Sequence, residues 1–160
     1  MILSVCPNPS VDCTIELDTL KTGSLNRVEN KVITYSGKAL NVAVGVARLG
    51  GDSFATGFMF DDNGKMFVHA LDDEGVKNTF VWNKGGARTN YKIVDKRSMM
   101  TEINDKGEPV PEEKQEELFV LMKSCYSKEQ LSYFFYTLSL HKEGDLKKLI
   151  EDNCLHVKSV

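Results

Sequence analysis

The segment Asn8-Pro9-Ser10-Val11-Asp12 follows a short apolar run, Ile2–Val5, and sets how the chain begins to fold. Pro9 fixes its own φ and biases Asn8 towards an extended conformation, so the apolar run is predicted to be a strand that ends here. Asp12 then lies just beyond the strand end, where its carboxylate can accept hydrogen bonds from hydroxyl groups.

A second segment, Ser36-Gly37-Lys38-Ala39-Leu40-Asn41, leads into a run without proline, Ala39–Leu49, that is predicted to be a helix. Gly37 allows a turn at low steric cost just before it, which places Lys38 and Asn41 at or inside the first helical turn. Unpaired backbone N–H groups and the helix dipole favour an anion at such a helix start. Together the two segments supply a carboxylate, an ammonium and an amide, which are groups that bind a phosphorylated sugar.

These segments resemble the PfkB/ribokinase family of carbohydrate kinases, and within it the phosphosugar branch typified by 1-phosphofructokinase and tagatose-6-phosphate kinase. That branch has an N-P-(S/A)-(V/L)-D start, an N-R linker, a G-G-K-G-x-N-V motif and a helix that ends on L-G. In this sequence Asn26-Arg27 matches the N-R linker and Leu49-Gly50 matches the helix end, so all four segments occur in the family order. Arg88-Thr89-Asn90 and Thr101-Glu102-Ile103-Asn104 resemble the family's R-x-N and T-E-I-N segments. Any one motif recurs by chance, so the specificity lies in the ordered set, which covers residues 1–125.

The resemblance implies a sugar-phosphate site that consists of Asp12, Gly37, Lys38, Asn41, Arg88, Asn90, Glu102 and Ser139. In such a site Asp12 accepts hydrogen bonds from sugar hydroxyls, while Lys38 and Arg88 neutralise the phosphate. The amides of Asn41 and Asn90 fix its orientation. Without the resemblance each residue has a plainer interpretation: Asp12 caps a turn, Arg88 belongs to a mobile loop, and the others are polar surface or edge-strand residues.

The sequence departs from the family pattern in several places. Ser36 and Ala39 replace two glycines of the lysine motif; alanine suits a helix start, whereas serine adds strain if position 36 needs φ > 0. Leu138 and His141 replace a glycine and a proline of the family's S-G-S-L-P turn. Neither the D-T-x-G-x-G-D motif of the catalytic base nor the N-x-x-E segment associated with magnesium occurs in the 160 residues. No catalytic residue is therefore predicted, and residues 126–160 are expected to be a truncated, divergent or frameshift-altered tail of the same domain.

The resemblance implies phosphoryl transfer from MgATP to fructose 1-phosphate, which gives fructose 1,6-bisphosphate. ATP and Mg²⁺ are the cofactors expected of the intact family, although the nucleotide-binding region is missing from this sequence. The alternative is a catalytically inactive fragment that binds a sugar phosphate or dimerises. The implied partner is a phosphorylated ketohexose, and the residues do not distinguish fructose 1-phosphate from tagatose 6-phosphate.

Composition and charge narrow the class of protein. Of the 160 residues 41% are hydrophobic, enough for a buried core, and the net charge of −3 comes from interspersed signs. Nucleic acid is therefore not an expected partner, and no apolar stretch approaches the ~20 residues that span a bilayer. The 4 cysteines lack C-x-x-C spacing, and neither they nor the 3 histidines form a metal motif. A cytoplasmic protein with reduced thiols and no metal site is predicted.

Short apolar runs alternate with helical patterns, which predicts an α/β fold with a parallel sheet. The resemblance makes this a partial ribokinase-like sheet with flanking helices. Strands are expected at Ile2–Val5, Phe54–Met59 and Thr79–Trp82, and helices at 40–49, 65–74 and 111–125, the first of them buried on most sides. Tyr133–Tyr136 is interpreted as a core strand rather than an aromatic binding surface, and Asp61–Gly64 as a helix cap rather than a calcium loop.

Three further regions, 11–17, 31–35 and 88–104, carry alternating or β-branched residues. They are predicted to form antiparallel strands apart from the main sheet, with a polar turn at 96–98. In the family such strands form a small β lid that covers the sugar and often supplies a dimer interface. The lid role and a homodimer through the lid follow only from the resemblance.

Overall fold

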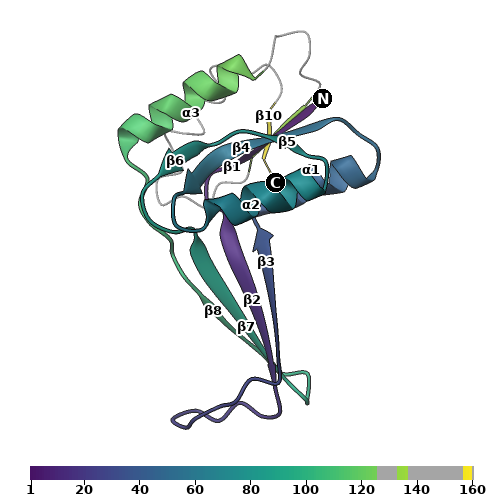
Figure 1. Ribbon diagram of the computed structural model, residues 1–160, viewed down its shortest axis with the longest axis vertical. Coiled ribbons are helices and arrows are strands. Elements are labelled where there is room, and N and C mark those ends of the chain that lie inside the picture. Colours follow the sequence, from purple (N-terminus) through teal and green to yellow (C-terminus); the bar gives the residue numbers. More distant parts are fainter. Residues whose placement is uncertain (126–132, 137–156, 160) are drawn as a thin grey trace.

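The computed structural model of the chain describes residues 1–125, 133–136 and 157–159. These residues form a main parallel sheet with helices on its faces and a second, narrower sheet that projects away from it (Figure 1). The α/β class and the two separate sheets are those that the sequence predicts.

The main sheet is built around the first apolar run of the chain. Its strands are β1 (Ile2–Cys6), β4 (Ser53–Phe60), β5 (Lys77–Asn78), β6 (Val81–Asn83), β9 (Tyr133–Tyr136) and β10 (Val157–Ser159). Their order is β10-β9-β1-β4-β5, with β6 also paired to β4, and all these pairs are parallel. The strands expected at 2–5, 54–59 and 133–136 are confirmed, whereas the strand expected at 79–82 is replaced by the two short strands β5 and β6.

Helices cover both faces of this sheet. On one face α1 (Lys38–Arg48) and α2 (Gly64–Asp73) place Leu40 and Phe67 in a buried cluster with Cys6 of β1. On the other face α3 (Glu112–Ser124) packs Leu118 and Met122 against the buried side chains of β1 and β4 (Figure 1). Burial on both faces explains why the central strands are continuous apolar runs rather than alternating ones.

Two helix predictions need correction. Helix α1 is not buried on most sides: Ala39, Leu40 and Ala43 are buried, but Leu49, directly after the helix, is almost fully exposed. Its apolar residues extend beyond the one stripe that the sheet and α2 cover. Pro111 is the N-cap residue of α3 rather than its first helical residue, and its ψ of 148° is extended.

The second sheet consists of the segments for which a lid role is predicted, and it is called the lid from here on. Its strands are β2 (Ser10–Leu17), β3 (Asn30–Ser36), β7 (Arg88–Asp95) and β8 (Met100–Asn104), in the order β3-β2-β7-β8. The two outer pairs are antiparallel as expected, but the central pair β2–β7 is parallel. Strand β2 follows β1 and β7 follows β6, and both β1 and β6 run parallel to β4. Both lid strands therefore leave the main sheet in the same direction.

Candidate functional site

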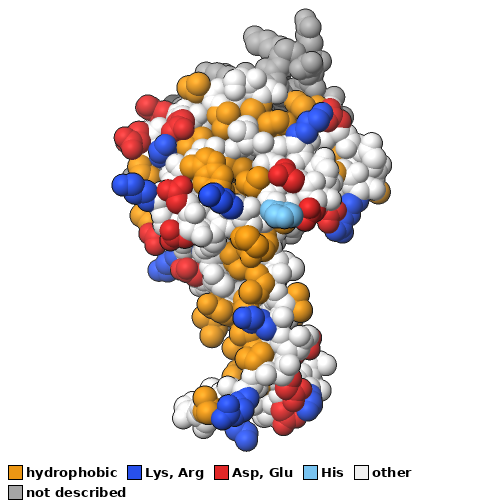
Figure 2. Space-filling model, in the orientation of Figure 1, with side chains coloured by type: hydrophobic (Ala, Val, Ile, Leu, Met, Phe, Trp, Pro, Cys, Tyr) orange, Lys and Arg blue, Asp and Glu red, His pale blue; other side chains and the backbone are white. Residues whose placement is uncertain are grey.

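The register of the lid separates polar from apolar side chains. One row across the four strands consists of Thr34, Asp12, Asn90 and Asn104, and the next row consists of Ile33, Cys13, Tyr91 and Ile103. Because successive residues of a strand point to opposite faces, the lid has a polar face and an apolar face. Hydrophobic side chains can be seen gathered along the lid in Figure 2. The predicted residues Asp12, Arg88, Asn90 and Glu102 all belong to the polar face.

Asp12 is the centre of the hydrogen-bond network on this face. It lies inside β2 rather than in a turn, and its side chain is only 17% exposed. Its Oδ1 accepts hydrogen bonds from Ser10 Oγ at 3.2 Å and Asn90 Nδ2 at 3.0 Å, and its Oδ2 accepts one from Lys92 Nζ at 3.3 Å. These donors come from β2 and β7, so the carboxylate joins the two central strands. The interpretation of Asp12 as a turn cap is therefore wrong.

Arg88 lies at the start of β7, beside the Asp12 network. Its Nη1 donates to Asn90 Oδ1 and to the carbonyl oxygen of Asp105, both at 3.4 Å. Its Nε is buried and has no hydrogen-bond partner among the residues described. Arg88 is thus held in a strand, not in a mobile loop, and a buried N–H without an acceptor is the kind of group that an anion would satisfy.

The lysine segment reaches the same region through β3. Ser10 lies opposite Ser36 of β3 on one side and Arg88 of β7 on the other, so the start of α1 is two strands away from Arg88. Gly37 is buried against Cys6, because a Cβ at this position would lie 2.6 Å from Cys6 Sγ. Lys38 follows as the first residue of α1, and its side chain is exposed.

Ser36 does not introduce the strain considered above. It ends β3 and is not among the residues with positive φ. Its Oγ lies within hydrogen-bond distance of both amide atoms of Asn41, at 3.2 Å from Nδ2 and 3.3 Å from Oδ1. The serine therefore positions the Asn41 side chain at the helix start.

Several predicted site residues are not joined to the Asp12 network in the described part of the chain: Gly37, Lys38, Asn41, which contacts Ser36 instead, and Glu102. Glu102 is exposed on β8, where it lies opposite Lys92 in the register and on the same polar face. Ser139 lies outside the described residues. Sequence reasoning missed Ser10 and Lys92, although the alternation Arg88, Asn90, Lys92 along one face of a predicted strand was a usable signal.

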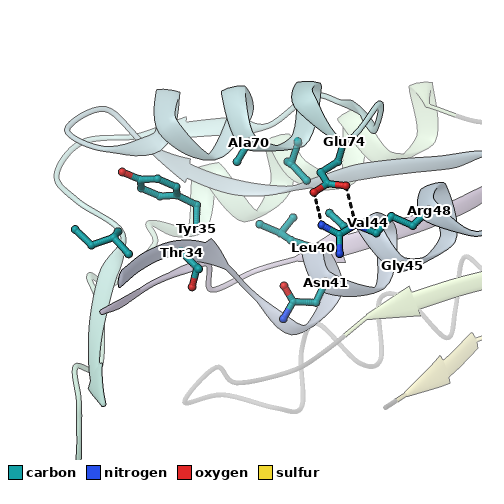
Figure 3. A pocket seen from close by; sticks show the side chains of 11 residues that line it. Thr34, Tyr35, Leu40, Asn41, Val44, Gly45, Arg48, Ala70 and Glu74 are labelled. Carbon is teal, nitrogen blue, oxygen red and sulfur yellow. Dashed lines mark hydrogen bonds and ion pairs between the residues drawn. The ribbon is translucent and has the colours of Figure 1, made fainter. Parts of the chain in front are cut away.

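A cavity of about 480 Å³ lies elsewhere, between β3, α1 and α2 (Figure 3). Of the predicted site residues only Asn41 lines it, and the rest of its wall is largely apolar. Arg48 and Glu74 form an ion pair at this cavity, and the guanidinium lowers the pKa of the Glu74 carboxyl. The polar chemistry of the site is on the lid face, so we place the candidate site there and not in this cavity.

The described residues form no three-residue metal cluster, and the Cys6 thiol beside Gly37 is buried. No group of three His, Cys, Asp or Glu side chains among them is placed so that it could hold a metal ion. Burial raises the pKa of the Cys6 thiol to about 12, which keeps it protonated at neutral pH. Nor does any helix within the described ranges have the length and apolar character to cross a membrane.

The Asn63 side chain holds the backbone just before Arg88 in place. It precedes α2 in the N-cap position that was predicted for this segment, but its side chain makes no capping hydrogen bond. Instead Asn63 Nδ2 donates to the carbonyl oxygen of Ala87 at 3.1 Å, and the Ala87 N–H donates to Asn63 Oδ1 at 2.9 Å. The residue before Arg88 is thereby tied to the carboxyl end of the main sheet.

A parallel α/β sheet from which a second, narrower sheet projects is the architecture of the ribokinase-like fold. The model of the pfkB family of carbohydrate kinases matches residues 8–149, and the chain belongs to that family. Its fold matches a ribokinase from Thermotoga maritima with a TM-score of 0.76, at 18% identity, over 99% of this chain and 52% of that one.

Within the family the chain is similar to 1-phosphofructokinases. It is 31% identical over 111 residues to the Vibrio cholerae enzyme, covering 69% of this chain and 35% of the relative. It is 39% identical over 95 residues to the 1-phosphofructokinase of Haloferax volcanii, covering 59% of this chain and 31% of the relative. A Thermotoga maritima structure described as a possible 1-phosphofructokinase matches with a TM-score of 0.83 at 26% identity, over 99% of this chain and 53% of that one. The chain thus spans only about a third to a half of the length of these proteins.

Proposed function

We propose that residues 1–125 form the sugar-phosphate-binding part of a kinase of the 1-phosphofructokinase type, whose whole reaction is MgATP-dependent phosphorylation of fructose 1-phosphate. The observation that carries the proposal is the placement of Asp12 and Arg88 on one lid face, two residues apart in register and joined through Asn90. A carboxylate and a guanidinium so placed can take the hydroxyl end and the phosphate end of one ligand. Membership of the pfkB family supports this assignment.

Each residue has a binding or orienting role in this proposal. Asp12 accepts hydrogen bonds from sugar hydroxyls. Arg88, through its buried Nε, and Lys38, at the positive end of α1, bind the phosphate that the substrate already carries. Asn90 holds Asp12 and Arg88 in place, and Asn41, fixed by Ser36, closes the site from the helix.

Gly37, Glu102 and Ser139 complete the proposed set. Gly37 lets the backbone turn closely past Cys6, and Glu102 lies at the polar edge of the lid. ATP with Mg²⁺ supplies the transferred phosphoryl group in such kinases. No step through that group is assigned to the residues described here, whose part is to bind and orient the acceptor, and a cytoplasmic location belongs to the same proposal.

A second candidate is a catalytically inactive chain that binds a sugar phosphate or dimerises. It is favoured by the exposed apolar side chains on the lid, which suit contact with a second copy of the chain. An inactive chain that binds a sugar phosphate shares the binding site with the first candidate and differs from it only in phosphoryl transfer.

Calorimetry with fructose 1-phosphate and with fructose tests the shared binding step. Fructose 1-phosphate should bind measurably more tightly than fructose, and Arg88→Gln should reduce that difference because it removes a charge-assisted contact worth roughly 1.5–3 kcal/mol. Arg97→Gln, at the lid turn, is the matched control and should bind as the wild type does. Equal affinity for the two sugars would reject the proposed site.

A further inference from the structure

Lys92 lies on the polar face of β7, two residues after Asn90, and was not part of the predicted site. Its Nζ is 3.3 Å from Asp12 Oδ2, and its side chain is 36% exposed. In the register Lys92 lies opposite Thr14 of β2 and Glu102 of β8. It is therefore in the middle of the lid face, between the two carboxylates of the candidate site.

The hydrogen bonds of Asp12 leave room for one more donor. A carboxylate offers about four acceptor positions, two on each oxygen. Ser10 and Asn90 occupy Oδ1, while Oδ2 accepts only from Lys92 among the residues described. The position that remains is on Oδ2, directly beside the ammonium group.

The ammonium group of Lys92 is also only partly used. It carries three N–H donors, and Asp12 takes one of them. A hydroxyl group placed between the two side chains can donate its proton to Asp12 Oδ2 and accept a hydrogen bond from Lys92 Nζ at the same time. A phosphate dianion or a carbonyl cannot do both, because neither has a proton to donate.

Charge gives a second reason for a lysine at this place. Asp12 shares the lid face with Arg88, where the phosphate is proposed to bind, and a carboxylate close to a phosphate repels it. Lys92 offsets the negative charge of Asp12 while leaving its free acceptor position open. A lysine that only joined β2 to β7 would stabilise the sheet and would have no effect on which ligand is chosen.

We propose that Lys92 and Asp12 together bind one hydroxyl of the sugar phosphate, which makes Lys92 a specificity-determining residue. The inference rests on the proposed function, because it needs a sugar phosphate on this face of the lid. The inference goes beyond the proposed function because it predicts which chemical group of the ligand is selected. That group is a hydroxyl that donates one hydrogen bond and accepts another.

Calorimetry on the full chain with three variants tests the inference. Lys92→Met removes the ammonium group and keeps the aliphatic stem, and it should weaken fructose 1-phosphate binding by roughly tenfold. Lys92→Arg keeps a positive donor and should recover part of the loss. Lys96→Met is the matched control, since Lys96 pairs with Asp18 at 3.0 Å and Glu29 at 3.1 Å at the far end of the lid. It should bind as the wild type does.

A set of monodeoxy fructose 1-phosphates supplies the readout that a structural role would not change. One of them should bind the wild type more weakly than the parent, and for that compound Lys92→Met should cause a clearly smaller further loss than for the other analogues. If every analogue loses affinity equally in Lys92→Met, or if all bind the wild type as the parent does, the inference is wrong while the proposed function stands. If the wild type binds no fructose 1-phosphate, both are wrong. The analogues tested on the wild type do not depend on how well the variants fold.

Discussion

Asn63 and Ala87 exchange two hydrogen bonds across 24 residues of chain, with the asparagine amide acting towards Ala87 as a neighbouring backbone would. The contact joins the segment before α2 to the segment before β7. Because Ala87 directly precedes Arg88, the Asn63 side chain fixes the backbone position from which the Arg88 side chain extends. A residue that the sequence suggests as a helix cap thus supports the candidate site instead.

Asn63→Ala should lower the free energy of unfolding by ~1–3 kcal/mol, because it leaves the partly buried N–H and C=O of Ala87 without partners. Urea denaturation followed by circular dichroism measures this. Asn63→Asp keeps the acceptor and loses the donor, so it should fall between the wild type and Asn63→Ala. Asn30→Ala, which removes an exposed hydrogen bond to Glu16, is the control and should change stability little. A stable Asn63→Ala would contradict the role of this contact.

Two glycines should respond in opposite ways to alanine. A Cβ at Gly57 would lie 1.9 Å from the backbone oxygen of Cys6, where φ is also +139°, so Gly57→Ala should unfold the chain or cost more than ~3 kcal/mol. A Cβ at Gly45, inside α1, meets nothing within 4 Å, so Gly45→Ala should stabilise by ~0.5–1 kcal/mol. Thermal unfolding of the two variants compares them directly. Similar shifts for both would mean that the approach of β4 to β1 is not this close.

Sequence reasoning predicts those parts of the fold that a single local pattern of residues determines. The apolar runs that became β1 and β4 are buried from both sides, and this reads directly from their composition. Alternation in β7 likewise indicates which residues share a face. It does not indicate the neighbour of the strand, which is why the parallel pairing of β2 with β7 was not predicted.

Other features depend on neighbours that no local pattern reveals. The exposure of Leu49 and the partial burial of the residues before it depend on how much of α1 the sheet and α2 cover. From the sequence Lys92 is expected to be a solvated strand lysine. The pairing of β2 with β7 places it beside Asp12. The sequence suggests Asn63 as a helix cap, and only the folded chain shows that its side chain bonds the backbone of Ala87 instead. Each case is a contact between segments far apart in sequence.

The apolar face of the lid should hold two copies of the chain together. Ile33, Tyr91 and Ile103 share one row on this face and are 44%, 42% and 57% exposed, and such patches mark interfaces. Ile33→Lys should therefore convert a dimer to a monomer in light scattering coupled to size exclusion. Val32→Lys is the matched control, because Val32 is 48% exposed on the opposite face. A wild type that is monomeric at all concentrations, or equal effects of the two variants, would contradict a lid dimer.

A polypeptide of these 160 residues should transfer no phosphoryl group from MgATP to fructose 1-phosphate. The residues contain no D-T-x-G-x-G-D motif to provide a base and a helix start for the transferred group, and such contributions are each worth powers of ten in rate. A coupled assay for fructose 1,6-bisphosphate measures this, with a mock purification from the same host as control. Turnover above that control would show that the catalytic groups lie within the chain.

The turn at the far end of the lid should become less stable in acid because of Asp95. This carboxylate is 6% exposed, and it accepts hydrogen bonds from the backbone N–H of Arg97 at 2.9 Å and of Met99 at 3.1 Å. The Arg97 guanidinium donates to it at 2.7 Å, and this contact, with the backbone donors, lowers the pKa of Asp95 below its ordinary value of 3.8. Since the folded-state pKa is the lower one, the stabilisation is complete above the unfolded-state value and is lost as the pH falls through the folded-state value.

Asp95→Asn should thus be less stable than the wild type at neutral pH, and the difference in free energy of unfolding should shrink only below about pH 4. Arg97→Met, which keeps the backbone donors, should show a weaker dependence on pH in the same range. Denaturant unfolding of the three proteins between pH 7 and pH 3 measures both effects, and a difference between wild type and Asp95→Asn that stays constant down to pH 3 would exclude a lowered pKa at this turn.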